Sequence, residues 1–135
     1  MYLIDTNIFL EVMLSCGRSE ECKRLLGALR SGKLRGAVTD FAIHSIMVLL
    51  GDLGRLDALK LFLRSLPAYR GLQIYTTSLA SEARAVDIAR KTGLDIDDAV
   101  QYEAALSLGA QAIVSFDKYF DDLEIPRVEP RELLG

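Results

Sequence analysis

Two short apolar runs in this chain end in an aspartate, and this pattern is the strongest constraint on its fold. The runs MYLID at residues 1–5 and QAIVSFD at residues 111–117 are typical of buried strands whose last residue leaves the sheet. Helix-like segments separate them from further strand candidates at residues 34–39 and 72–77. This alternation predicts an α/β domain with a mostly parallel central sheet. Right-handed crossovers would place helices on both faces and give three layers, α/β/α.

The helical segments are marked by apolar residues at helical spacing and by glycines after the last turn. Gly32 and Gly93 are expected to end two of them in the left-handed conformation. The tail after Pro126 is expected to add an edge strand. The sequence predicts helices over residues 8–15, 19–32, 40–54, 55–66 and 78–93, and a further helix that has Ala99, Tyr102 and Leu106 on one face.

Composition sets the class of protein. A chain of 135 residues with 50% hydrophobic residues fits one domain, residues 1–135, with a sizeable core. No apolar run approaches the length of a membrane span, and the start has no basic segment typical of a signal peptide, so we expect a cytoplasmic protein. Cys16 and Cys22 lack the spacing of a zinc site, which predicts idle thiols. The net charge of −3 argues against a surface that grips nucleic acid everywhere.

Three acids stand at positions that a parallel sheet can bring together. Asp5 and Asp117 follow predicted strands, and Asp98 opens a predicted helix. Two carboxylates about 5 Å apart repel by roughly 3 kcal/mol at an effective dielectric constant near 20. Three together require protonation, a basic partner or a divalent cation, and hard oxygen ligands suit Mg²⁺ or Mn²⁺. Such an ion would activate water and neutralise charge on a phosphodiester.

The stretch LDIDDAVQYEAA at residues 94–105 also has a purely structural explanation. Asp95 can cap the helix start, and Asp97 and Asp98 sit favourably in its positive first turn. We expect Asp95 to be the cap and Asp98 to bind metal. Asp97 stays open between the two roles.

With these motifs the chain resembles the PIN-domain family of metal-dependent ribonucleases, and within it small prokaryotic proteins like the VapC-type toxins. The matching pieces are YLIDTNIFLE, GLDIDDAVQYEAALSLGA and IVSFDKYFDDL, in the family's order. The resemblance implies a PIN-like α/β/α fold, cleavage of RNA, and Mg²⁺ or Mn²⁺ as cofactor. Carried over position by position, the resemblance implies that Asp5, Asp98 and Asp117 are catalytic and bind the metal. It also implies Asp121 as an auxiliary ligand, and Asn7 and Ser115 as residues that orient the acids.

One position departs from the family's pattern. The family usually carries a second acid, commonly Glu, in the helix after the second strand, and Ser45 stands there with His44 beside it. Glu11 is the candidate substitute ligand. His44 is expected to be a partly buried, hydrogen-bonded imidazole rather than a ligand or base.

Three functions from different classes compete at this stage. The first is a Mg²⁺- or Mn²⁺-dependent ribonuclease that is the toxin of a toxin–antitoxin pair. The second is a catalytically weak or inactive PIN-like module that binds RNA or a partner. The third, a phosphatase with an aspartate nucleophile, lacks its proton donor because Asn7 stands two residues after Asp5. The partners that the family implies are RNA, a small antitoxin and a second copy of the chain.

Overall fold

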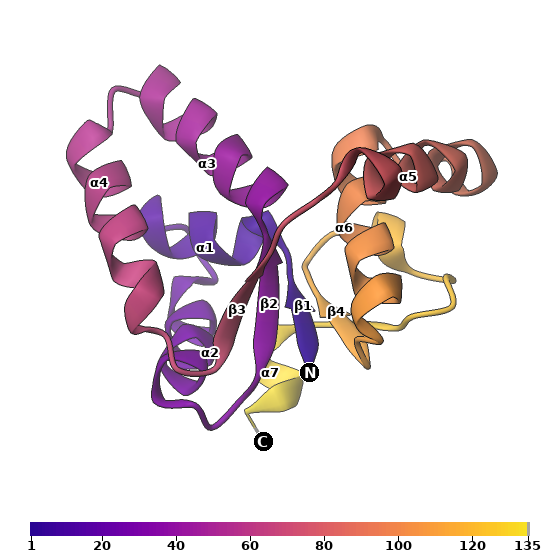
Figure 1. The fold of residues 1–135 in the computed structure, drawn as a ribbon. Coiled ribbons are helices and arrows are strands. Elements are labelled where there is room, and N and C mark those ends of the chain that lie inside the picture. Colours follow the sequence, from indigo (N-terminus) through magenta and orange to yellow (C-terminus); the bar gives the residue numbers. More distant parts are fainter. Residues whose placement is uncertain (135) are drawn as a thin grey trace.

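The protein, described over residues 1–134 by a computed structural model, is built on one five-stranded sheet. All neighbouring strands are parallel, in the order β3-β2-β1-β4-β5 (Figure 1). The edge strand expected in the tail is present as β5, beside β4. The strands are β1 (Tyr2–Ile4), β2 (Gly36–Thr39), β3 (Leu72–Tyr75), β4 (Ala112–Val114) and β5 (Arg127–Val128).

Helices connect the strands, because parallel neighbours cannot be joined by a tight turn. Helices α1 and α2 connect β1 to β2, α3 and α4 connect β2 to β3, and α5 and α6 connect β3 to β4. Two 3₁₀ turns, η1 (Leu66–Ala68) and η2 (Lys118–Phe120), follow α4 and β4. The helices are α1 (Thr6–Met13), α2 (Ser19–Ser31), α3 (Asp40–Asp52), α4 (Leu56–Ser65), α5 (Leu79–Thr92), α6 (Ile96–Leu108) and α7 (Pro130–Leu133).

Each inner strand contributes to two separate cores, because successive side chains point to opposite faces of a sheet. In β1, Ile4 packs in the apolar cluster of α1 to α4, whereas Leu3 packs in the cluster of α5 and α6. Val114 and Ile113 of β4 divide in the same way. Figure 1 shows α1 to α4 on one side of the sheet and α5 and α6 on the other. The predicted three-layer α/β/α fold is confirmed.

Glycines end the helices at the positions where the sequence placed them. Gly32 and Gly93 follow α2 and α5 with φ of 85° and 78°, in the left-handed region that residues with a Cβ avoid. Gly109 ends α6 in the same way, with φ of 63°. Each glycine turns the chain from a helix toward the next strand.

The carboxyl ends of β1 and β4 meet in the middle of the sheet. The two strands pair along the whole length of β1. Beyond the last pair, the backbone N–H of Asp5 donates to the carbonyl oxygen of Val114 at 3.0 Å. The residues that follow both strands therefore emerge side by side at one edge.

At Gly71, just before β3, the backbone packs tightly against the segment between α2 and β2. A Cβ placed there would overlap the carbonyl oxygen of Leu34 and lie 2.9 Å from that of Leu29, and backbone atoms cannot rotate away. We expect Gly71→Ala to lower the free energy of unfolding by at least about 2 kcal/mol in urea titrations. The matched control is Gly27→Ala on α2, where nothing lies within 4 Å; it should raise stability by about 0.5–1 kcal/mol. Equal stability of the two variants would contradict this packing.

Candidate functional site

Asp5 is a buried carboxylate at the end of the central strand β1. Only 4% of its surface is exposed. It occupies the N-cap position of α1, yet its side chain makes no capping hydrogen bond. Helix capping therefore does not account for this acid.

Ser115, after β4, ties the ends of β1 and β4 together. Its Oγ donates to Oδ2 of Asp5 at 2.5 Å and accepts the backbone N–H of Asp117 at 2.9 Å. Nδ2 of Asn7 donates to the same Oγ at 3.4 Å. Because Ser115 is fully buried, this network holds the Asp5 carboxylate in one orientation. Asn7 and Ser115 thus lie where orienting residues were expected.

Asp98 opens onto the same edge from α6. Asp95 is the N-cap residue of this helix, and its Oδ1 accepts the backbone N–H of Asp98 at 2.9 Å. The prediction that Asp95 caps the helix is confirmed. The carboxylate of Asp98 is left free of that task.

Burial and neighbouring carboxylates change the ionisation of Asp98 and Asp5. Burial, and then the negative charges of Asp95, Asp117 and Asp5, raise the pKa of Asp98 to about 8, and a hydrogen bond with the Asp117 carboxyl acts in the same direction. Burial also raises the pKa of Asp5, although hydrogen bonds from Ser115 and Gln101 oppose the shift. The structure therefore brings Asp5, Asp98 and Asp117 together, as the sequence predicted.

Unpartnered oxygens gather around the same edge. Buried side-chain oxygens without a hydrogen-bond partner in residues 1–134 belong to Thr6, Asn7, Asp97 and Gln101. Each of these residues lies within three positions of Asp5 or Asp98 along the chain. Native proteins satisfy nearly all buried polar atoms, so such a concentration indicates a place for water or an ion. Burial and the charge of Asp95 also raise the pKa of Asp97, whose role stays open.

The donor atoms suit a hard divalent cation, but they do not form a compact cage. Carboxylate and amide oxygens are the ligands that Mg²⁺ and Mn²⁺ prefer. Over the part of the chain that the structure describes, no group of three His, Cys, Asp or Glu side chains lies close enough to hold an ion. The acids are thus near enough to interact and fit the cation chemically, while their spacing is looser than that of a preformed cluster.

Two expected ligands lie elsewhere. Oε2 of Glu11 accepts the backbone N–H of Arg18 at 3.0 Å in the turn between α1 and α2. Oδ1 of Asp121 is paired with Nε of Arg127 at 2.8 Å, on the exposed side of η2. The structure does not bring either carboxylate to the other three acids.

Ser45, which the sequence pattern places at the family's second acidic position, brings no carboxylate to the site. Oγ of Ser45 donates to the carbonyl oxygen of Phe41 one turn earlier in α3, at 3.1 Å. His44 is exposed, and the expectation of a partly buried imidazole is wrong, because its helix face looks into solvent rather than into the core. Neither residue supplies a ligand in this arrangement.

Gln101 is the site residue that sequence reasoning missed. It is 1% exposed, and its amide lies beside the Asp5 carboxyl. The available signal was a polar residue three positions after Asp98, on a helix whose neighbouring residues are almost all apolar.

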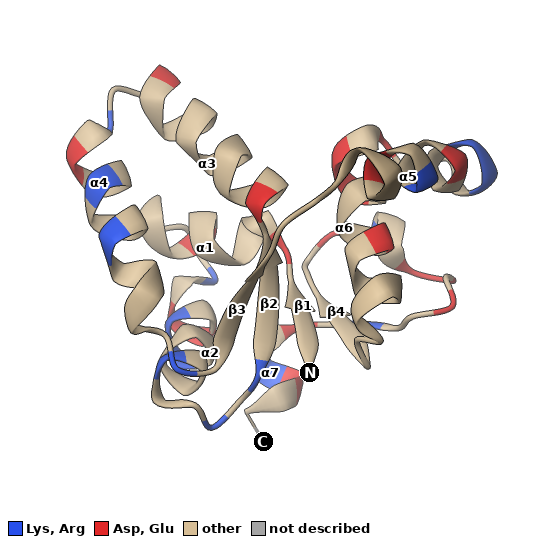
Figure 2. Cartoon of the chain, in the orientation of Figure 1, with Lys and Arg blue, Asp and Glu red and all other residues tan. Residues whose placement is uncertain are grey.

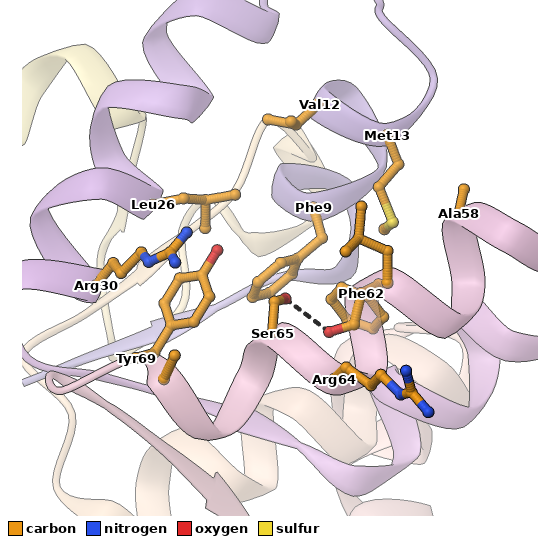
Figure 3. Close-up of a pocket in the computed structure, with 12 residues that line it drawn as sticks. Phe9, Val12, Met13, Leu26, Arg30, Ala58, Phe62, Arg64, Ser65 and Tyr69 are labelled. Carbon is orange, nitrogen blue, oxygen red and sulfur yellow. Dashed lines mark hydrogen bonds between the residues drawn. The ribbon is translucent and has the colours of Figure 1, made fainter.

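A separate apolar groove of about 600 Å³ lies between α1, α2 and α4, away from the acids (Figure 3). Phe9 and Phe62 form its floor and meet edge to face at 5.6 Å, and Arg30 and Arg64 stand at its rim. Figure 2 shows basic residues on the side of α2 and α4 and acidic residues over α6 and the carboxyl edge. The two regions therefore have opposite charge.

Comparison with known proteins gives a family and a fold. A family model described as PIN domain matches residues 2–126. The structure is similar to the Mycobacterium tuberculosis toxin VapC20, which cleaves the sarcin–ricin loop, with a TM-score of 0.79, 16% identity, and coverage of 96% of this chain and 100% of that chain. A toxin–antitoxin complex from Klebsiella pneumoniae has a TM-score of 0.72 and 20% identity, with coverage of 96% of this chain and 98% of that chain. VapBC2 from Rickettsia felis has a TM-score of 0.66 and 15% identity, with coverage of 95% of this chain and 97% of that chain.

Neither a curated sequence relative nor a membrane-spanning helix is found for the described residues. No curated protein sequence matches the chain significantly. Within residues 1–134, none of the helices has the length and apolar character needed to cross a bilayer.

The raised pKa of Asp98 predicts how stability depends on pH in the presence of EDTA. Its unfolded pKa is near 3.8, so the stability it contributes is complete below about pH 4 and is lost as pH rises to about 8. We expect the free energy of unfolding to fall over this range, and to fall less steeply in Asp98→Asn. Asp87→Asn, on the exposed face of α5, should keep the wild-type slope. Urea titrations at several pH values measure the slopes, and equal slopes for Asp98→Asn and wild type would contradict the shift.

Proposed function

Because the chain belongs to the PIN domain family, we propose that it is a cytoplasmic ribonuclease that hydrolyses RNA phosphodiester bonds with Mg²⁺ or Mn²⁺. The observation that carries the proposal is the meeting of Asp5, Asp98 and Asp117 at the carboxyl ends of β1 and β4, with a raised pKa for Asp98. A buried carboxyl whose pKa is raised further by the negative charges of its neighbours favours a cation beside it.

Asp5, Asp98 and Asp117 would hold the ion. A bound divalent ion lowers the pKa of a coordinated water and neutralises charge that develops on the phosphate. Ser115 holds Oδ2 of Asp5 through its hydroxyl group, so the carboxylate keeps one orientation. Oδ1 of Asn7, which is buried and has no partner in residues 1–134, would accept a hydrogen bond from water beside Asp5.

Asp98 couples metal binding to proton release. With its pKa near 8, much of the Asp98 carboxyl is protonated at neutral pH before an ion arrives. A ligating carboxyl must be deprotonated, so uptake of the ion would release that proton. Affinity for Mn²⁺ should consequently rise with pH through this range.

A catalytically weak or inactive PIN-like module is the second candidate function. Ser45 lacks the carboxylate that the family usually has, and its hydroxyl is already engaged by the carbonyl of Phe41. The acids in residues 1–134 also do not form a compact cluster of three. Such a module would act through binding of RNA or a partner.

A small antitoxin is the protein partner that the apolar groove would fit. Residues 23–70, which supply much of the groove, contain nine Lys and Arg against three Asp and Glu, a net charge of +6. The exposed Leu61, with 71% of its surface accessible, lies among the apolar lining residues, while Arg30 and Arg64 offer positive charge at the rim. We infer that an acidic, amphipathic antitoxin segment binds there, which would make the chain the toxin of a toxin–antitoxin pair.

A second copy of the chain would bind to the outer face of α3 and the turn after it. Apolar side chains are exposed there without another described element to cover them, which is typical of an interaction surface. The exposed fractions are 37% for Met47, 65% for Val48, 37% for Leu49, 54% for Leu53 and 64% for Leu56. We propose a homodimer through this face.

Cleavage of RNA tests the leading function. Pure protein with Mn²⁺ should cut RNA, and EDTA should stop the cutting. Asp5→Asn, which removes a ligand charge but keeps the shape, should lower the rate at least about 100-fold. Asp121→Asn is the matched control, because its carboxylate is paired with Arg127 rather than with the other acids, and it should retain most activity.

Two results would reject the ribonuclease. Cutting that survives Asp5→Asn would show a contaminating nuclease. Saturable binding of Mn²⁺ in calorimetry without any cutting would favour the inactive module.

Two surface substitutions separate the two protein contacts. Val48→Glu places a charge on the α3 face and should convert a dimer into a monomer in analytical ultracentrifugation. Leu61→Glu places the same charge in the groove and should leave the dimer intact. Both side chains are largely exposed, so both variants should fold. A wild-type protein that sediments as a monomer would reject the dimer.

A further inference from the structure

Gln101 is a polar side chain buried in α6, and no contact within residues 1–134 accounts for its carbonyl oxygen. It is 1% exposed, and its Oε1 has no hydrogen-bond partner within residues 1–134. Its neighbours in the chain, Val100 and Tyr102, are buried in the apolar core, with 4% and 5% of their surfaces exposed. A leucine or methionine would fill the same space without an unsatisfied carbonyl oxygen.

The amide of Gln101 lies at the acidic edge. It stands three residues after Asp98, so the two side chains share one face of α6. The Gln101 side chain lies close enough to the Asp5 carboxyl to lower the pKa of Asp5. Because a carboxylate only accepts, Nε2 is the donor. Oε1 is attached to the same carbon atom, so it lies close to this carboxylate with no donor of its own.

Once Asp98 is ionised, only a cation or a water molecule can satisfy an oxygen in that position. A nearby carboxylate offers no proton when it is ionised, and repels a second acceptor. Amide carbonyl oxygens are regular ligands of hard divalent ions. The acid that the family usually supplies from α3 is absent, since Ser45 is turned toward Phe41.

We propose that Oε1 of Gln101 is a neutral oxygen ligand of the divalent ion, beside Asp5, and takes the place of the acid missing at Ser45. The proposal rests on the proposed metal-dependent function. Nε2 keeps Asp5 in place, and Oε1 contributes a dipole rather than a charge. The ion would then be held by fewer negative charges than is usual in the family, and an added charge at residue 101 should increase its affinity.

Two substitutions with opposite expected effects test this role. Mn²⁺ alone is titrated calorimetrically into the full chain at pH 8.5. Gln101→Met keeps the length but removes both polar atoms, and should weaken Mn²⁺ binding at least about 10-fold. Gln101→Glu keeps an oxygen in place and adds a negative charge, and should tighten binding at least about 10-fold. Gln73→Met, at an exposed position of β3, is the matched control and should bind like wild type.

The outcomes separate this inference from the proposed function. Wild-type protein without saturable Mn²⁺ binding overturns both. If wild type binds Mn²⁺ and both variants bind it with the same affinity, only the role of Gln101 is overturned, and a water molecule is then the partner of Oε1. Weaker binding in both variants also overturns it, because a packing or positioning role alone predicts loss in each. Thermal unfolding in EDTA checks the fold, and if Gln101→Met does not fold, the direction of change in Gln101→Glu decides.

Discussion

The parallel pairing of β1 with β4 is the constraint on which the rest of this structure depends. It joins residues more than a hundred positions apart in the chain, and the bond from the Asp5 N–H to the Val114 carbonyl extends it to the edge of the sheet. Ser115 then binds Asp5 side chain to side chain. Because both strands also supply apolar residues to both cores, the geometry of the acidic edge is fixed by the same packing that stabilises the domain.

The acidic edge works against the stability that this packing provides. Burial of Asp5, repulsion around Asp98 and the unpartnered oxygens of Asn7 and Gln101 are all unfavourable in the absence of a ligand. Local rules that fail together at one place, while the surrounding core is well packed, are typical of a functional site. A divalent cation bound by these acids and by Gln101, as proposed, would remove this conflict.

Opposite charges are distributed to different faces of this small chain, as the proposed functions require. The net charge of −3 hides a segment, residues 23–70, with a net charge of +6. The groove beside that segment is apolar with a basic rim, whereas the edge with Asp5, Asp98 and Asp117 is acidic. A charged phosphodiester chain and an acidic protein segment would thus meet different surfaces, with binding at the acidic edge possible only through the metal ion.

The sequence by itself determined the layers and the acids. Short apolar runs, helical spacing, Gly32 and Gly93 as helix ends, and Asp95 as a cap follow from local chemistry. That Asp5, Asp98 and Asp117 are neighbours follows from the rule that parallel strands share a carboxyl edge. Tertiary structure alone decided which polar side chains reach that edge. Glu11 is drawn to the Arg18 backbone, Asp121 to Arg127, and Gln101 turns inward to Asp5. Spacing along the chain cannot reveal these choices, because each depends on a partner that only packing brings within hydrogen-bonding distance.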